Sequence, residues 1–218
     1  MQDCHTYLPP PPQLIVPLWL DGSLIVVVKP PGLLAVPGRG ADKQDSMSLR
    51  VQAQYADALI VHRLDMATSG LMVFARGVAM QSRLSQMFRE REVYKRYEAR
   101  VLGQLAQEVG EINLPVGGDW PNRPKQCVDM LRGKYALTRF RLLEYVATND
   151  TSRVALEPVT GRTHQLRVHL AALGHPILGD TLYGDAGSAP RLLLHASELQ
   201  FRHPLTGVPV SCVCQAQF

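Results

Sequence analysis

Residues 61–70 read VHRLDMATSG and place one carboxylate, Asp65, between the basic pair His62 and Arg63 and a turn-forming TSG. A nearby cation favours the ionised form of a carboxylate. An ionised carboxylate in a sheltered site can act as a nucleophile or a general base. The alternative is that Asp65 caps the turn and Arg63 is a surface charge. Because this segment is compatible with both interpretations, the choice depends on the rest of the chain.

A second polar cluster opens residues 160–180, TGRTHQLRVHLAALGHPILGD. We expect a helix over residues 163–173, ended by Gly174. His164 and Arg167 lie three positions apart and therefore share one face of it. Basic and hydroxyl groups at the positive end of a helix suit a phosphate or a carboxylate. Any one of these residues is typical of an ordinary surface helix, and only their density favours binding: Arg162, His164, Gln165 and Arg167.

Two further segments carry weaker signals. Residues 119–126, DWPNRPKQ, form a proline-stiffened loop that can present polar side chains to a sugar–phosphate backbone, although an ordinary loop would look similar. Its candidate contacts are Asn122, Arg123, Lys125 and Gln126. In YKRY, Tyr97 lies on the apolar face of an expected strand, where a tyrosine is usually part of the core but can also stack on a base.

The elements that would position these residues follow from periodicity and breakers. Helices are expected at 46–56, capped by Ser46 or Ser48, and at 78–90. Strands are expected at 24–29, 70–76, 93–101, 135–146 and 152–158. Strands and helices do not alternate strictly, which favours an α+β fold around a mostly antiparallel sheet. Residues 1–17, with their PPPP run, indicate an extended, weakly ordered arm, and 18–218 indicate one folded domain without an internal linker.

Composition excludes several classes of function. The chain has a net charge of +4 and a pI of about 9.0, which permits an anionic partner without requiring one. Four cysteines without a CxxC pair match neither a disulfide framework nor a zinc site, and a reducing cytoplasm is expected. No signal peptide or membrane span is indicated. Metal-binding HExxH, phosphate-binding GxxxxGK[ST] and GxGxxG, and the esterase GxSxG motif are all absent from the sequence, so we expect no metal or nucleotide cofactor.

Taken together, the segments resemble the RluA family of pseudouridine synthases. The resemblance runs in order through KPPGLLAVPG, HRLDMATSG, YKRYEARV, GRTHQLRVH, GHPILGD and RLLLHA, and spans most of the chain. DWPNRPKQ is similar to the small members of this family that modify both 23S rRNA and a tRNA anticodon loop. The S4 RNA-binding domain of some relatives is not expected here. The resemblance implies a mixed, mostly antiparallel sheet with flanking helices, a central RNA-binding cleft, and cofactor-free isomerisation of uridine in RNA.

The resemblance also implies roles for individual residues. Asp65 matches the catalytic aspartate, Arg167 the basic residue that pairs with it, and Tyr97 the tyrosine that stacks on the target base and is a candidate for removing the C5 proton. Arg63 matches the residue that occupies the space left by the flipped nucleotide, and Leu194 an apolar wall of the pocket. Thr68 in the TSG turn joins the RNA-binding candidates. We expect the RNA, as 23S rRNA and tRNA stem-loops, to be the only partner of a cytoplasmic monomer.

Two other interpretations remain open on the residues alone. The basic loops and the net charge of +4 are compatible with a non-catalytic RNA-binding or ribosome-assembly module, which would not need the Asp65 carboxylate. A small hydrolase could use Asp65 as its nucleophile, but no second acidic residue lies near His164 in the sequence to act as its general base.

Overall fold

The computed structural model describes residues 7–218, which divide into two compact units. Unit 1 runs to Val93 and resumes over Gln200–Cys214. Unit 2 comprises Tyr94–Leu199 together with Gln215–Phe218. No Gly-, Pro- or Ser-rich linker marks the passage from one unit to the other. The single domain expected over residues 18–218 therefore contains two units that the sequence did not separate.

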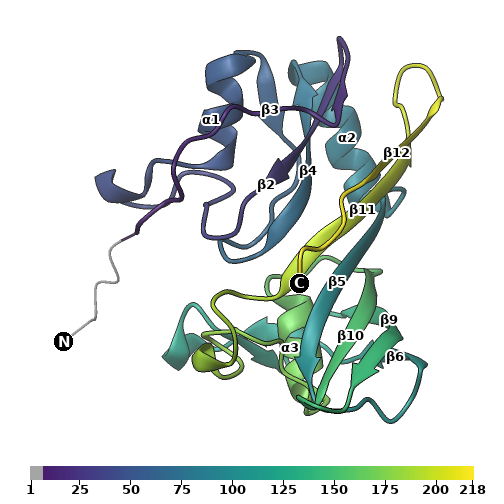
Figure 1. Ribbon diagram of the computed structural model, residues 1–218. Helices are drawn as coiled ribbons and strands as arrows, with labels where there is room; N and C mark the ends of the chain where they lie inside the picture. The colour runs from purple at the N-terminus through teal and green to yellow at the C-terminus, as the bar shows by residue number, and fades with distance from the viewer. Residues whose placement is uncertain (1–6) are drawn as a thin grey trace. The chain divides into compact units, whose positions relative to one another are not determined.

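Unit 1 is built on two long paired strands. Its elements are β1 (Trp19–Leu20), β2 (Leu24–Lys29), η1 (Ala41–Lys43), α1 (Met47–Gln54), β3 (Ala58–Ile60), β4 (Ser69–Arg76), α2 (Val78–Glu90) and β12 (Pro209–Val213). β2 and β4 pair antiparallel along their whole length, with β1 on the outer side of β2 and β3 added to β4 (Figure 1). The β-branched run of β2 is almost entirely buried because it is a central strand.

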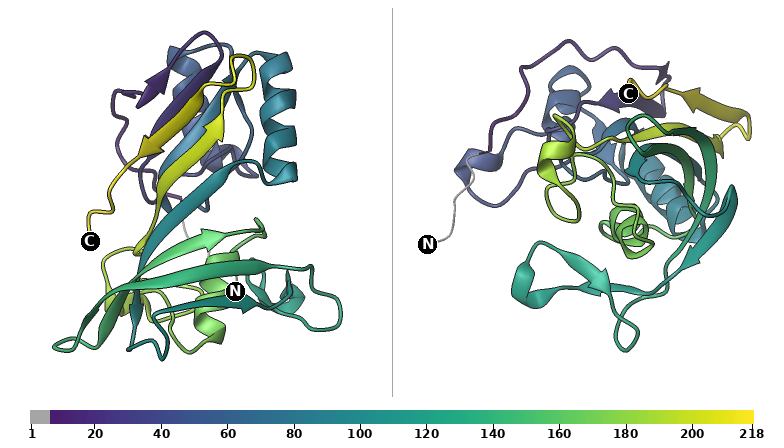
Figure 2. Two further views of the ribbon diagram at one scale, coloured as in Figure 1. Left: turned by 90° about the vertical axis from the view of Figure 1, so that its right-hand side faces the viewer. Right: turned by 60° about the horizontal axis from the view of Figure 1, so that its bottom comes forward.

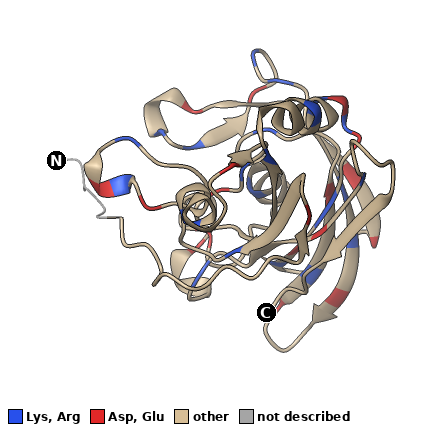
Figure 3. Ribbon diagram, turned by 90° about the horizontal axis from the view of Figure 1, so that it is seen from above, with Lys and Arg blue, Asp and Glu red and all other residues tan. Residues whose placement is uncertain are grey.

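Unit 2 is an antiparallel sheet with one short helix. Its elements are β5 (Tyr94–Leu102), β6 (Val109–Asn113), β7 (Val116–Gly118), η2 (Trp120–Asn122), β8 (Gln126–Val128), β9 (Leu137–Val146), β10 (Thr151–Pro158), α3 (Gln165–Ala172), η3 (Ala186–Ser188) and the first residues of β11 (Leu194–Arg202). The strands pair in the order β5-β10-β9-β6, and β7 and β8 form a separate hairpin (Figure 2). Both acidic and basic residues occur along its long strands (Figure 3).

Local sequence patterns predicted most of these elements. The strand at 24–29 and the helix at 78–90 have the expected bounds, and Ser46 caps α1 by accepting the N–H of Leu49. The helix expected over 163–173 is α3, which begins later because His164 adopts a left-handed backbone with φ 55°. The mostly antiparallel α+β architecture is confirmed.

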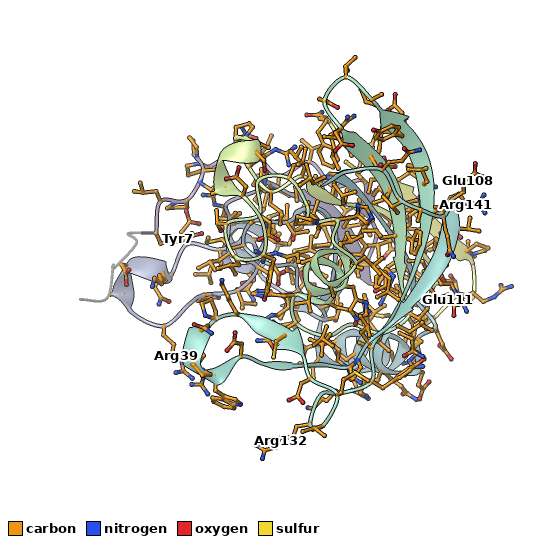
Figure 4. All side chains as sticks on the ribbon, turned by 90° about the horizontal axis from the view of Figure 1, so that it is seen from below. Tyr7, Arg39, Glu108, Glu111, Arg132 and Arg141 are labelled. Atoms are coloured by element: carbon orange, nitrogen blue, oxygen red, sulfur yellow. The ribbon has the colours of Figure 1, made fainter. Side chains whose placement is uncertain are left out.

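The proline-rich arm differs from the expectation of weak order. Residues 1–6 of that arm lie outside the described residues. Residues 7–17 have no regular secondary structure, but Tyr7, which is labelled in Figure 4, is buried. Its hydroxyl donates to the carbonyl of Asp45. Arg50 donates to the carbonyls of Pro10 and Pro11. This part of the arm is extended and held by specific hydrogen bonds.

Candidate active site

The HRLD segment is anchored by its histidine. His62 Nε2 accepts the backbone N–H of Val73 in β4 at 3.0 Å, and its ring stacks on Phe88 of α2 with centroids 4.5 Å apart. Leu64 is also buried. Arg63, which lies between His62 and Leu64, is exposed. Asp65, which follows Leu64, is partly exposed. The segment therefore has an extended alternation that turns the two charged side chains away from the core of unit 1.

The backbone around Asp65 is fixed by three hydrogen bonds. The N–H of Thr68 donates to the carbonyl of Asp65 at 3.1 Å and closes the turn. The carbonyl of Met66 accepts the N–H of Gly32 at 2.9 Å and the Lys29 ammonium at 3.0 Å. Gly32 has φ +80°, a conformation that favours glycine, which explains the PPG sequence at this point. The Asp65 turn is thereby tied to the loop that follows β2.

Lys29 is the strongest electrostatic feature beside this turn. Its side chain is fully buried, and Nζ donates to the carbonyls of Pro30, Leu33 and Met66 at 2.7–3.0 Å. Burial lowers the pKa of Lys29 to about 7, and the negative charge of Asp65 opposes that shift. The three carbonyl acceptors favour the ammonium form, because only that form has three hydrogens to donate. An amine that carries its positive charge below about pH 7 is therefore held close to the Asp65 carboxylate within unit 1.

In unit 2, Arg167 is held by a buried ion pair. Its Nε and Nη2 donate to the two carboxylate oxygens of Asp180 at 2.8 and 2.7 Å. Both side chains are buried. Burial by itself would raise the pKa of Asp180, but the hydrogen bonds and charge of Arg167, with the N–H groups of Leu182 and Tyr183, lower it overall. The two-pronged pairing fixes the plane of the guanidinium.

Tyr183 connects Arg167 to the loop at 119–126. The Arg167 guanidinium carbon lies 5.1 Å from the centre of the Tyr183 ring. The Tyr183 hydroxyl accepts the backbone N–H of Gln126 at 2.7 Å and lies 2.7 Å from His164 Nδ1. Three of the residues predicted from the sequence, Gln126, His164 and Arg167, therefore meet around one tyrosine that the sequence analysis did not select.

Gln165 is buried, and its side-chain amide bonds to neighbouring residues of unit 2. It is 3% exposed. Its Oε1 accepts from Thr160 and from the N–H of Arg162, and its Nε2 donates to Leu137 and Thr138. Thr68 is likewise buried, at 2% exposed. This placement differs from the RNA contacts expected of Gln165 and Thr68, because both side chains are buried. We interpret Gln165 as a residue that holds the local backbone. Arg162, in contrast, is exposed.

The loop at 119–126 is exposed and internally braced. The guanidinium carbon of Arg123 lies 3.5 Å from the centre of the Trp120 ring, and Trp120 is 72% exposed. Asn122 Nδ2 donates to the Asp119 carboxylate. The peptide bond from Arg123 to Pro124 is cis. The hairpin continues past β8 to a loop on which Arg132 projects outward (Figure 4). An exposed aromatic ring stacked with a cation is a surface that suits nucleic acid.

The remaining predicted residues lie on strands of unit 2. Tyr97 is partly exposed in β5, opposite Leu156 of β10. Leu194 is the first residue of β11 and is buried. The predicted catalytic trio takes Asp65 from unit 1 and Tyr97 and Arg167 from unit 2, and its assembly stays a prediction.

Sequence reasoning missed Lys29, Asp180 and Tyr183. A lysine that ends the buried run LIVVVK was a signal for Lys29. The other two stand in GHPILGDTLY, where no spacing rule connects them to Arg167. Across residues 7–218 there is no cluster of three or more His, Cys, Asp or Glu side chains suited to a metal ion. Over the same residues, no helix is long and apolar enough to cross a membrane.

Comparison with known proteins identifies the class. The family model described as RNA pseudouridylate synthase matches residues 23–172, which include the Asp65 turn and Arg167. The chain belongs to this family and is an RNA pseudouridine synthase, an isomerase that converts uridine in RNA to pseudouridine.

Curated relatives share nearly the full length of the chain. It is 49% identical over 217 residues to the dual-specificity RNA pseudouridine synthase RluA of Escherichia coli strain K12, covering 98% of this chain and 99% of that one. It is 46% identical over 215 residues to the RluA of Haemophilus influenzae, covering 97% and 98%.

Solved structures of human proteins share the fold. Human RNA pseudouridylate synthase domain containing 1 superposes with a TM-score of 0.77 at 28% identity, over 94% of this chain and 86% of that one. Human RNA pseudouridylate synthase domain containing 4 gives 0.73 at 26% identity, over 92% and 88%. These likenesses agree with the α+β architecture described above.

Proposed function

We propose that this pseudouridine synthase isomerises uridine in both 23S rRNA and a tRNA anticodon stem-loop, by flipping the target base out and using Asp65. The observation that carries the assignment of Asp65 is the geometry of its turn. The carboxylate is partly exposed, the carbonyl of the next residue, Met66, is tied to Gly32 and Lys29, and the buried Lys29 amine lies close to the carboxylate. The dual substrate is supported by the curated relatives, which are named dual-specificity enzymes.

The reaction requires one bond exchange on the nucleoside. The bond from N1 of uracil to C1′ of the ribose breaks, and a bond from C5 to C1′ forms. C5 then loses its hydrogen as a proton while N1 gains one, so the reaction is redox-neutral and consumes no second substrate. Cleavage of the glycosidic bond develops positive charge at C1′. Attack at C1′, attack at C6 and removal of a sugar proton are three routes open to Asp65, and all of them need an ionised carboxylate.

Arg167 is proposed to orient that carboxylate. Its pairing with Asp180 uses Nε and one hydrogen of Nη2, so a contact with Asp65 would be made by Nη1 or by the second hydrogen of Nη2. A guanidinium that is already held in one plane can direct a second carboxylate at little further cost in conformational entropy. Tyr97 is proposed to stack on the flipped uracil and to be the candidate that removes the C5 proton, and Leu194 to form an apolar wall of the pocket.

RNA binding is assigned to exposed cations and to the braced loop. Extruding a base costs a few kcal/mol of stacking, and Arg63 is proposed to occupy the vacated position and offset part of it. Trp120 and Arg123 would stack on the nucleic acid, while Arg162 would contact phosphates. Asn122, Lys125, Gln126 and His164 complete this surface. We propose that the protein acts as a cytoplasmic monomer without a required protein partner or cofactor.

The test is release of tritium from RNA that carries [5-³H]uridine, using separate 23S rRNA and tRNA anticodon stem-loops. We expect the unmodified protein to release tritium from both. Asp65→Asn, which preserves the size of the side chain, should reduce release at least 10³-fold while RNA binding persists, because the carboxylate participates in every route. Asp42→Asn, on the exposed η1, is the control and should release tritium normally.

Two outcomes would contradict this proposal. Turnover by Asp65→Asn at the normal rate would exclude Asp65 as the catalytic carboxylate. Release from only one of the two stem-loops would exclude dual specificity and leave the synthase activity in place.

A further inference from the structure

Residues 7–17 of the proline-rich arm are fastened to the rest of unit 1 by a clasp that we define as Tyr7, Asp45 and Arg50. The Tyr7 hydroxyl donates to the carbonyl of Asp45 at 2.9 Å and accepts the N–H of Leu34 at 3.0 Å. Tyr7 is 9% exposed although it lies near the start of the chain. One phenol oxygen therefore joins the arm to two other segments of unit 1.

Arg50 fastens the next stretch of the arm. Its Nε and Nη2 pair with the Asp45 carboxylate at 2.8 and 2.7 Å, and its Nη2 and Nη1 donate to the carbonyls of Pro10 and Pro11 at 2.6 and 3.3 Å. A proline has no N–H, so its carbonyl is the only backbone hydrogen-bonding group that the arm offers at each of these positions. The guanidinium, with five donors in one plane, matches this set of acceptors.

Packing alone does not explain why the arm stays in place. A cavity of about 250 Å³ lies in unit 1 where the arm passes. It is lined by Pro10, Leu14 and Val16 of the arm and by Val28, Leu33 and Met47. Leu14 and Val16 are also 80% and 72% exposed. The arm therefore does not pack closely against unit 1 along its whole length, and the hydrogen bonds of the clasp contribute to its attachment.

The clasp is connected to the Asp65 turn by an unbroken series of hydrogen bonds. Tyr7 accepts from Leu34, and the carbonyl of the preceding residue, Leu33, accepts from Lys29. Lys29 donates in turn to Met66, the neighbour of Asp65. The carbonyl of Leu34 also accepts the N–H of Met47 at 2.7 Å, which ties the same loop to α1.

We propose that the arm is a positioning element of the active site, and that Tyr7 and Arg50 act on catalysis through the loop at 30–35 and the Asp65 turn. This inference rests on the proposed role of Asp65. The arm does not touch the reacting atoms in this role. The arm restricts the position of the loop at 30–35, whose carbonyls of Pro30 and Leu33 accept from Lys29. Because Lys29 also donates to Met66, the same contacts restrict the backbone beside Asp65. A displacement of that carboxylate by about 1 Å can reduce a rate about 10²-fold.

The experiment compares Tyr7→Phe and Arg50→Gln with two matched controls. Tyr7→Phe removes one oxygen and keeps the ring. Its control is Tyr145→Phe, whose hydroxyl bonds to Asp150 in unit 2. The control for Arg50→Gln is Arg76→Gln, because Arg76 also pairs with a carboxylate, Asp57, and with a backbone carbonyl in unit 1. kcat and KM are measured by tritium release at a temperature where all proteins are fully folded by circular dichroism.

We expect kcat to fall about tenfold in Tyr7→Phe and Arg50→Gln, with KM changed less than twofold, and both controls to keep their kcat. The double variant should lose little more than either single variant, because the two residues act through one clasp. A kcat equal to that of the controls would overturn the proposal. A raised KM with unchanged kcat would also overturn it and identify the arm as an RNA contact. Failure of the proposed role of Asp65 is distinguishable, because Asp65→Asn would then release tritium at the normal rate whatever the result with the clasp variants.

Discussion

Replacement of Asp180 by asparagine tests how unit 2 holds Arg167. Asp180 is completely buried, and both of its oxygens are paired with the guanidinium. Oδ1 also accepts the N–H groups of Leu182 and Tyr183. An asparagine that keeps its oxygen in this position must turn its NH2 group toward Arg167 Nε, so that two donors face each other. The substitution thus takes the Asp180 counter-charge away from the buried guanidinium of Arg167.

The expected cost follows from that geometry. Removal of one partner from a buried ion pair typically costs about 3–5 kcal/mol. Domains are stable by only about 5–15 kcal/mol, so the loss is a large part of the total. With a urea dependence of about 3 kcal/mol per molar, the unfolding midpoint should decrease by about 1–1.7 M. Asp185→Asn is the control, because Asp185 is exposed and caps η3 through an oxygen that asparagine also has.

The assay is equilibrium urea unfolding followed by circular dichroism. A second variant, Arg167→Met combined with Asp180→Leu, removes both charges and should recover most of the stability, since apolar replacements of buried pairs are often neutral. This double variant should be inactive in tritium release if Arg167 orients Asp65. A change of less than 1 kcal/mol in Asp180→Asn would refute the reasoning, as would a double variant that is less stable than Asp180→Asn.

Two further predictions concern pH and salt. Burial lowers the pKa of His169, whose Nε2 donates to Leu114 and whose Nδ1 accepts from Thr138. In the unfolded chain this histidine binds a proton near pH 6.5, whereas folded His169 stays neutral. The free energy of unfolding of the protein, relative to that of His169→Gln, should therefore decrease as pH falls below about 6.5. Urea titrations measure this difference, and a difference that does not change with pH would contradict the prediction. Arg123→Ala should reduce the slope of log affinity for a stem-loop RNA against log salt by about 1, as measured by filter binding. Arg141→Ala on β9 is the control and should keep the slope of the unmodified protein. If Arg123→Ala also keeps that slope, Arg123 does not contact the RNA.

The order of the motifs along the chain predicted the pseudouridine synthase family, and the comparisons confirmed it. The individual residues fared differently. Gln165 stands in a motif that suggested RNA contact, yet all four of its hydrogen-bonding positions are used inside unit 2. Its neighbour Arg162 is exposed. A motif records which residues occur together but not which of them face solvent, so the division between contact and support needed the coordinates.

By itself, the sequence determined the elements whose cause is local. The β-branched run at 24–29 and the helical spacing at 78–90 depend on residues a few positions apart, and both elements are where they were expected. The cap of α1 is equally local, and it is Ser46, one of the two candidates. Only the tertiary structure decided the partners of Lys29, Asp180 and Tyr7. Their partners include backbone carbonyls, which every residue has, and side chains that lie many positions away in the chain. Such pairings leave no periodicity in the sequence, because the folded chain alone brings the groups together.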